Sequence, residues 1–342
     1  AAPGAAFRGR GRMVALGLVA AAGIAHHHMI ILLFPVGFYG VYRAVEESER
    51  PSVSLAVGLG CAVLGLFAYG YLVWVTRMVP EAYHWAEAQS WSDLVRIFFR
   101  RAYGTFELAD EDGHHFSVLQ QWSLLGAETA ADLSYLPVVL ALVGPVAPFV
   151  GRQAEQEGVD RLGMAALLAA WVLSGPVFVA LISRGFDGAD YLHLRKFHAQ
   201  FELLTVVWCG FGASLLGRYI SRRGLALLVL VGLVVTGGVR ALTYRQEHTG
   251  PAVEQYVEDT LAALPEGAVL VGDSDHRYFG VAYAQRALGR RPDVDYIDTK
   301  LLGFGWYRQR IASRLGFETG ATDQETHLGV LVRRVAEAER PL

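Results

Sequence analysis

The stretch MVALGLVAAAGIAHHHMIILLFPVGFYGV, from Met13 to Val41, decides the class of protein. It is apolar on both sides of three consecutive histidines, His26, His27 and His28. Long apolar runs are typical of membrane segments. Titratable side chains at membrane depth are costly unless they face a cavity, an interface or a partner. The stretch therefore predicts an integral membrane protein whose histidines do not simply contact lipid.

The composition of the whole chain favours the same class. Of 342 residues, 53% are hydrophobic and 18% are charged, and the mean hydropathy is +0.31, whereas about 25% charged residues is usual in soluble domains. The net charge of −3 gives no general attraction for nucleic acid, so no such partner is expected. Cys61 and Cys209 lie in apolar runs and are expected to be small core residues.

Seven apolar segments predict a mainly α-helical membrane domain over residues 1–250. The first two flank the histidines, and each is shorter than the about 20 residues of a spanning helix. We therefore expect a short helical hairpin bent at the histidines, or one long helix broken there. The segments are Met13–Ala25, Met29–Tyr42, Val53–Val75, Leu133–Val150, Leu162–Ile182, His198–Gly217 and Leu225–Leu242.

Arginines predict the orientation, because cytoplasmic loops carry an excess of basic residues. If all the arginines that flank these segments lie on one side, the first two segments must go in and out of the membrane. The histidines, the loop 77–132, the loop 183–197 and the C-terminal tail then lie outside the cytoplasm. The arginines are Arg8, Arg10, Arg12, Arg43, Arg50, Arg152, Arg161, Arg218, Arg222 and Arg223.

The composition changes at Pro251, and residues 251–342 are predicted to form a small soluble α/β domain. Gly267–Val271 (GAVLV) and Val294–Asp298 (VDYID) are expected to be buried strands, with a helix over Phe279–Leu288 between them. A strand, a helix and a strand at this spacing are typical of a parallel βαβ unit.

The histidine cluster is the first candidate site. Successive side chains on an α-helix point about 100° apart, so His26, His27 and His28 converge on one ligand only if the helix is broken there. A broken helix would suit a phosphate or an acidic group near the outer surface. The alternative is a helix end whose imidazoles cap backbone groups or contact lipid headgroups. A metal site is not expected, because no acidic or cysteine partner lies nearby in the sequence.

The outer loop 77–132 carries the second candidate, within the stretch Glu81–Gly104. Its apolar residues recur at helical spacing and predict an amphipathic helix on the membrane surface. Arg100, Arg101 and Tyr103 follow, and guanidinium groups bind phosphate through paired, charge-assisted hydrogen bonds. The alternative is anchoring at the membrane interface. The apolar residues are Trp91, Leu94, Val95, Phe98 and Phe99.

Asp273 and Asp275 form the third candidate, because they follow an expected strand and ligands bind at the carboxyl ends of parallel strands. Two carboxylates there suit sugar hydroxyls or a metal. The alternative is that Ser274 or Asp275 caps the following helix. The polar loop Arg184–His198 is expected to be a solvated connection.

Four phrases of the chain resemble a bacterial family of polytopic membrane proteins long catalogued as being of unknown function. The eukaryotic relative of that family is an endoplasmic-reticulum protein O-mannosyltransferase of the GT-C class. The resemblance covers nearly the whole chain but only the later part of the family, and it implies a bacterial inner-membrane location. The phrases are GIAHHHMIILLFP (Gly23–Pro35), RRAYGTF (Arg100–Phe106), LPEGAVLVGDSD (Leu264–Asp275) and RRPDVDYIDTKLLGFGWY (Arg290–Tyr307).

The resemblance implies the C-terminal part of an inverting glycosyltransferase that moves a sugar from a polyprenyl-phosphate donor to an extracytoplasmic acceptor, for instance a protein hydroxyl. The lipid-linked sugar is the donor substrate implied, and the resemblance leaves open whether a divalent metal is required. Membrane lipid and a protein or glycan acceptor are the partners implied. The donor-phosphate residues implied are His26, His27, His28, Arg100, Arg101 and Tyr103. The acceptor residues implied are Asp273, Asp275, Trp306 and Tyr307.

The resemblance places the catalytic base elsewhere. The family's acidic motif and its His-Pro-Pro-Gly-Tyr-Pro-like motif lie near the family's N-terminus, and neither occurs in residues 1–342. The chain begins with Ala1 rather than Met, and its first residues lack the order of a signal peptide, so we expect sequence upstream. The alternative function is a non-catalytic membrane protein whose outer domain binds a glycan or a protein. A transporter ranks third, because paired halves with broken helices are not seen in the sequence.

Overall fold

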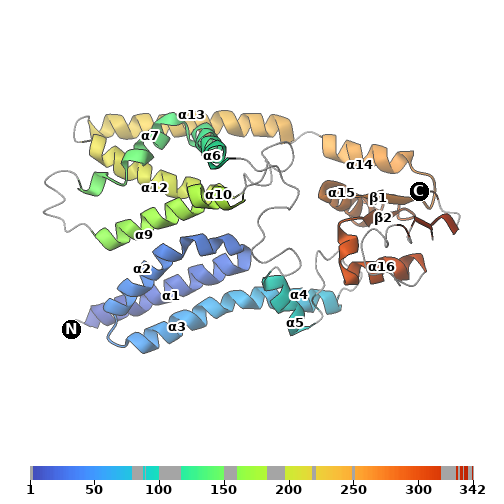
Figure 1. Cartoon of the computed structure of the whole chain (residues 1–342), viewed down its shortest axis with the longest axis horizontal. Coiled ribbons are helices and arrows are strands. Elements are labelled where there is room, and N and C mark those ends of the chain that lie inside the picture. The colour runs from blue at the N-terminus through green and yellow to red at the C-terminus, as the bar shows by residue number, and fades with distance from the viewer. Residues whose placement is uncertain are drawn as a thin grey trace. The chain divides into compact units, whose positions relative to one another are not determined.

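The computed structural model describes residues 3–78, 88, 90–99, 117–149, 160–182, 197–217, 221–248 and 251–316, together with 329, 332, 333, 335–337 and 341. These residues form two compact units that separate at Tyr244, and each is described by itself. Unit 1 is built from helices, and unit 2 from helices and a two-stranded sheet (Figure 1). The separation lies close to Pro251, where the composition changes.

The chain begins unit 1 with a helical hairpin that turns at the histidines. Helix α1 (Pro3–His26) is followed by a 3-10 turn, η1 (His28–Leu33), and by α2 (Phe34–Glu46), which packs beside α1 (Figure 1). At the base of the hairpin an Arg12 amino group lies 2.8 Å from the Glu47 carboxylate. Helix α1 is longer than the expected Met13–Ala25, because the helix continues through the arginine-rich residues that precede the apolar run.

Helix α3 (Pro51–Val63) continues through a short 3-10 turn into α4 (Phe67–Met78), and together they form an apolar helical stretch of 28 residues. It packs closely on α1 because glycines face the partner helix. A Cβ atom on Gly17 would collide with the Gly58 carbonyl oxygen. Small residues allow membrane helices to approach at this distance, where dispersion forces hold them together.

Helix α5 (Trp91–Phe98) lies within the stretch expected to be amphipathic. A capping box starts it, in which Ser90 and Asp93 each accept a hydrogen bond from the other's backbone N–H. Leu94 is buried, whereas the Trp91 side chain is 79% exposed. The described part of the stretch is therefore an amphipathic helix, as its spacing predicts.

Helix α6 (Val118–Leu133) is the largest departure from the sequence prediction, which placed these residues in an outer loop. It meets α7 (Tyr135–Val143) at an angle of 118°, at a Ser134 whose φ is +71°. The helix packs within unit 1 and buries Gln121, Leu125 and Thr129 along one face. Polar residues lower the hydropathy of α6, so the sequence prediction did not recognise its buried face, whose residues recur every four positions.

The remaining helices of unit 1 complete the bundle. Helix α9 (Arg161–Val172) passes through a π-helical turn, η5 (Leu173–Val177), into α10 (Phe178–Ile182). Helix α12 (Ala199–Leu216) packs along α7, and α13 (Arg222–His248) follows. An ion pair joins Arg240 of α13 to Asp132 of α6.

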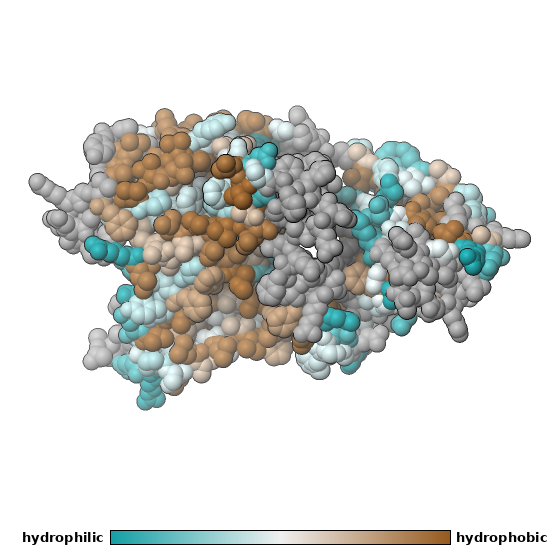
Figure 2. Space-filling model, in the orientation of Figure 1, coloured by the Kyte–Doolittle hydropathy of each residue, from teal (hydrophilic) through white to brown (hydrophobic). Residues whose placement is uncertain are grey.

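Several of these helices are suited to a membrane. Among the described residues, 4 helices are long and apolar enough to cross one, or 5 if the bent pair α6–α7 is a single span. A shorter apolar stretch, Leu227–Thr243, lies within α13. Figure 2 shows broad apolar areas over the helices of unit 1, which water would not favour. The chain is thus an integral membrane protein, while the described residues do not confirm the expected number of seven segments.

Unit 2 contains the predicted βαβ arrangement. Strands β1 (Val269–Gly272) and β2 (Asp295–Asp298) pair in parallel, with Val269 opposite Asp295, and α15 (Asp275–Arg286) lies between them in the chain. Helix α14 (Ala252–Ala263) precedes the sheet, and η6 (Leu301–Gly303) and α16 (Gly305–Leu315) follow it. The buried core joins all these elements, with members that include Val257, Leu261, Val269, Val281, Ile297 and Ile311.

Candidate functional site

The helix break predicted at the histidines lies at His27, and it gives the three histidines different roles. His26 is the last residue of α1 and is exposed. His27 is extended, with φ −161° and ψ 141°, and its Nδ1 accepts a hydrogen bond of 3.1 Å from the backbone N–H of Met29. His28 opens the 3-10 turn. His27 therefore caps η1, which is the structural role considered as the alternative.

Aromatic side chains from distant segments pack on the two inner histidines. The His28 ring lies 5.3 Å from the ring of Phe98, at the end of α5. The His27 ring lies 5.5 Å from the ring of Phe197, which precedes α12, and Phe197 in turn meets Phe178 of α10. The histidine turn thus lies where α5, α10 and the start of α12 come together within unit 1.

The Nε2 atom of His28 is the atom of this turn that lacks a hydrogen-bond partner among the described residues and could bind a ligand. This nitrogen atom is also buried. A buried polar atom left without a partner costs free energy, so native proteins seldom retain one that has no purpose. An imidazole nitrogen held in this way can hydrogen-bond or pair electrostatically with an anionic ligand.

Arg100, Arg101 and Tyr103 lie outside the described residues. Phe98, which contacts His28, precedes Arg100 by two residues in the chain. The predicted donor-phosphate set is therefore described only in its histidine part.

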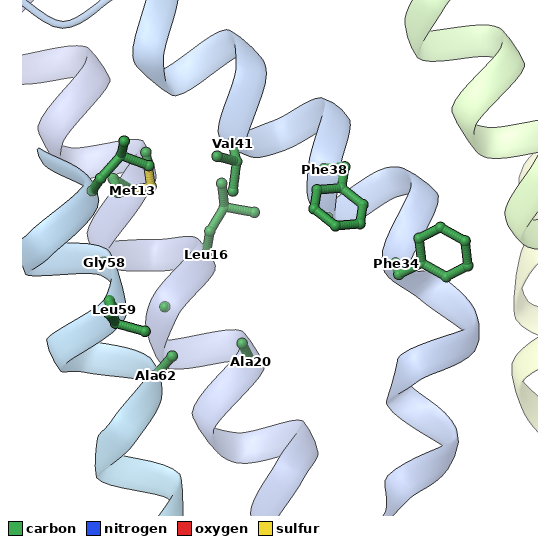
Figure 3. Close-up of a pocket in the computed structure, with 12 residues that line it drawn as sticks. Met13, Leu16, Ala20, Phe34, Phe38, Val41, Gly58, Leu59 and Ala62 are labelled. Atoms are coloured by element: carbon green, nitrogen blue, oxygen red, sulfur yellow. The ribbon is translucent and has the colours of Figure 1, made fainter. Parts of the chain in front are cut away.

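An apolar groove runs along the hairpin and α3 (Figure 3). Its volume is about 380 Å³, within the range of small-molecule sites, which is about 300–1,000 Å³. Ala20 and Phe34 line it, and each lies about two helical turns from the histidine cluster along the chain. The groove thus follows apolar helix faces, and its lining includes none of the three histidines. Its lining includes Leu16, Ala20, Phe34, Phe38, Gly58 and Ala62.

In unit 2, Asp273 and Asp275 follow β1 at the carboxyl edge of the sheet, as predicted. Asp273 is exposed, and only the backbone of Asp275 is described, as the first residue of α15. Ser274 is the N-cap residue, but its side chain makes no capping hydrogen bond with the described backbone. Asp273 is therefore the described carboxylate of this pair that is accessible to a ligand.

Tyr307 corrects the prediction for the acceptor contacts. Its side chain is 2% exposed, and its hydroxyl accepts a hydrogen bond of 2.8 Å from the backbone N–H of Asp298. It fastens the end of β2 to α16 and offers no surface to an acceptor. Trp306, beside it, is half-buried, stacks with Phe304 and carries the Arg310 guanidinium over its ring at 5.5 Å.

Gly272 ends β1 under a buried tyrosine. A Cβ atom at this position would lie 2.5 Å from the hydroxyl of Tyr296, so a larger residue would require the Tyr296 side chain to move. Burial, with the nearby Asp298 carboxylate adding to it, raises the pKa of Tyr296 to about 12. The hydroxyl therefore stays protonated at neutral pH, and the glycine of the GDSD phrase has a packing role.

Arg291 and Asp293 form a clamp that the sequence did not suggest, although both belong to the RRPD phrase. Arg291 donates hydrogen bonds to the carbonyl oxygens of Leu264 (2.9 Å) and Pro265 (2.7 Å), after the end of α14. Asp293 accepts hydrogen bonds from Arg291 and, at 2.9 Å, from the backbone N–H of Gly267. Part of this motif is therefore structural, because it ties the turn before β1 to the turn before β2.

The hydrogen bonds between Arg291, Asp293 and Gly267 should make the stability of unit 2 depend on pH. The hydrogen bonds from Arg291, followed by that from Gly267, hold the pKa of Asp293 well below its usual range. A lowered pKa contributes its full stability above the unfolded-state pKa of about 3.9. The contribution declines as the pH falls below that value and is lost as the pH falls through the lower folded-state pKa. In Asp293→Ala, exchange of the Gly267 amide hydrogen should be faster than in the unaltered protein at neutral pH. This difference in exchange rate should shrink toward pH 3.

Asp259→Ala serves as the control, because it removes an exposed carboxylate of α14. An exchange-rate difference between Asp293→Ala and the unaltered protein that stays undiminished at low pH would contradict the assignment.

The described residues hold no group of three or more His, Cys, Asp or Glu side chains arranged to bind a metal ion.

Comparison with known proteins places this geometry in context. The chain is 22% identical, over 331 residues, to Protein O-mannosyl-transferase TMEM260 of Mus musculus, an alignment that covers 91% of the chain and 45% of the mouse protein. The chain is a distant relative of protein O-mannosyl-transferases. It is also 18% identical over 309 residues to Protein O-mannosyl-transferase tmem260 of Dictyostelium discoideum, covering 84% of the chain and 38% of that protein. The chain spans less than half the length of these relatives. No family model and no solved structure matches it.

Proposed function

We propose that this chain is part of a membrane glycosyltransferase that transfers a sugar from a polyprenyl-phosphate donor to a hydroxyl group of a protein. The observation that carries the proposal is the histidine turn, where a buried Nε2 of His28 has no partner among the described residues. Mannose is the sugar we propose, because the names of both relatives specify O-mannosyl transfer.

The proposed chemistry is displacement at the anomeric carbon. The acceptor oxygen forms the new glycosidic bond, and the bond from the anomeric carbon to the phosphate oxygen breaks with inversion. The polyprenyl phosphate leaves with the bonding electrons, and the base takes the acceptor proton. Negative charge grows on the departing phosphate, so His27, His28, Arg100 and Arg101 are proposed to stabilise it. The base is proposed to lie outside this chain's described residues.

The groove along α1, α2 and α3 supports a lipid-linked donor. Its wall is apolar, and two of its lining residues, Ala20 and Phe34, each lie six residues from the histidine cluster along the chain. We propose that the isoprenoid chain of a donor whose phosphate binds at the turn follows this groove. We propose that the turn faces the side of the membrane opposite the cytoplasm, on the strength of the arginines at the base of the hairpin. Asp273 and Trp306 of unit 2 are the proposed acceptor contacts.

Transfer of mannose from a synthetic polyprenyl-phosphate mannose to a hydroxyl-bearing protein tests the function directly. The test uses the natural full-length protein that contains this chain, purified in lipid nanodiscs. Mannosylated product detected by mass spectrometry supports the proposal. No transfer from any polyprenyl-phosphate sugar, combined with binding of a glycan or protein by unit 2, would instead favour a non-catalytic binding protein.

The double variant Arg100→Ala, Arg101→Ala tests the phosphate assignment. Loss of charge-assisted contacts to the donor phosphate should raise the donor KM by about tenfold, which corresponds to about 1.4 kcal/mol. Arg96→Ala is the matched control, because Arg96 lies on α5 and its exposed guanidinium pairs with Asp93 at 2.9 Å. Equal donor KM values for the double variant and the control would contradict the assignment.

A further inference from the structure

Gln121 is a buried polar residue in unit 1 that the proposed function does not yet use. Its side chain is 1% exposed, and both the amide oxygen and the amide nitrogen lack a hydrogen-bond partner within the described part of the chain. An amide carries an acceptor and two donors, and burial of all of them without partners is costly. A bound water molecule or a ligand would supply the missing hydrogen-bond partners.

The position of Gln121 on α6 relates it to the histidine turn. Leu125 lies one turn further along the same face and packs with Phe178, Phe201 and, at the edge of that cluster, Met29. Met29 directly follows His28. The same face of α6 therefore turns toward the region in which the histidine turn lies.

The backbone that contacts the start of α6 is irregular. The Nε1 of Trp122, next to Gln121, donates a hydrogen bond of 2.9 Å to the carbonyl oxygen of Pro176 in the π-helical turn η5. That turn also contacts η1, the segment that starts at His28. π-Helical turns within α-helices occur frequently at functional sites. The start of α6 is thus fastened to the element that borders the histidine turn.

We propose that the Gln121 side chain hydrogen-bonds the sugar hydroxyls of the lipid-linked donor. The inference rests on the proposed function and extends it to sugar recognition. A phosphate oxygen only accepts hydrogen bonds and would leave the Gln121 carbonyl oxygen without a partner. A hydroxyl both donates and accepts, so neighbouring sugar hydroxyls satisfy the amide oxygen and the amide nitrogen together. Gln121 is then a specificity-determining residue rather than a stabiliser of the leaving group.

Gln121→Met tests this assignment, because methionine has nearly the same length and no hydrogen-bonding amide. Thr129→Val is the matched control: Thr129 is buried on the same face of α6, and its hydroxyl donates to the Leu125 carbonyl oxygen of its own helix. If Gln121 contacts the sugar, the melting temperature of the methionine variant should be no lower than that of the unaltered protein. Its donor KM should rise by about tenfold for each lost hydrogen bond. The valine variant should keep the donor KM.

Ligand-induced thermal stabilisation supplies a readout that does not depend on transfer. The probes are a polyprenyl-phosphate mannose and the same polyprenyl phosphate without sugar. The unaltered protein should be stabilised more by the first probe than by the second, and Gln121→Met should remove this difference while it keeps the response to the bare lipid phosphate.

The possible outcomes separate this inference from the proposed function. Transfer by the unaltered protein together with an unchanged donor KM in Gln121→Met overturns the Gln121 assignment and leaves the transferase intact. Absence of transfer together with a sugar-dependent stabilisation that the variant loses overturns the transferase and leaves the assignment intact. A lower melting temperature of Gln121→Met with an unchanged sugar response identifies a structural amide, bridged by water, and overturns the inference.

Discussion

Replacement of His28 by phenylalanine is expected to lower kcat for mannosyl transfer by about one-hundred- to one-thousandfold, the usual effect of removing one group that stabilises charge in the transition state. The phenylalanine ring preserves the packing against Phe98, whose ring lies 5.3 Å from that of His28. The substitution removes both ring nitrogens, and the buried Nε2 has no partner among the described residues. The thermal stability of the variant should therefore be equal to or higher than that of the unaltered protein.

His26→Phe is the control for this prediction, because His26 is exposed at the end of α1 and lies outside the proposed contacts. It should leave kcat within about twofold, the range typical of surface substitutions. Steady-state kinetics with a saturating polyprenyl-phosphate mannose, together with thermal unfolding of each variant, provides the measurement. A comparable loss of kcat in the two variants would indicate that the cluster acts through the membrane surface rather than through the His28 nitrogen.

Gly212→Val should destabilise unit 1 by about 3 kcal/mol, the upper part of the usual range for overpacking. A Cβ atom at Gly212 of α12 would collide with the Leu140 carbonyl oxygen of α7, and one at Gly144 would collide with the Trp208 carbonyl oxygen of α12. The two helices therefore meet backbone to backbone at both glycines, so neither contact is relieved by rotation of a side chain.

Gly210→Val is a matched control on the same helix, because a Cβ atom at Gly210 has no atom within 4 Å. Thermal unfolding in detergent, monitored by the fraction of monodisperse protein, should show a large loss for Gly212→Val and little change for Gly210→Val. Equal behaviour of the two variants would show that α7 and α12 do not pack through Gly212.

The candidate site was only partly predictable from the sequence. The costly position of the histidines in apolar sequence identified them, and the helix break was expected for the same reason. The division of roles among them was not, because it depends on Phe98 and Phe197, which are far from the histidines in the chain. Tyr307 was misassigned because an aromatic residue after a strand looks the same in sequence whether it faces solvent or the core.

Gln121 was missed for a related reason. In the sequence it belongs to a polar segment between apolar runs, so it was assigned to an outer loop. Only the packing of α6 against α10 and η5 shows that a face of this segment is buried. The clamp of Arg291 and Asp293 was likewise invisible, since its partners are backbone carbonyl and N–H groups.

The sequence by itself determined the membrane class, a bend or break of the helix at the histidines and the parallel βαβ order of unit 2. These follow from hydropathy, charge and strand spacing, which are local properties of the chain. The tertiary structure alone decided which side chains meet. Contacts between segments distant in sequence decide that the His28 ring packs on Phe98, that Gln121 is buried and that Tyr307 lies in the core. Local patterns carry no information about such contacts.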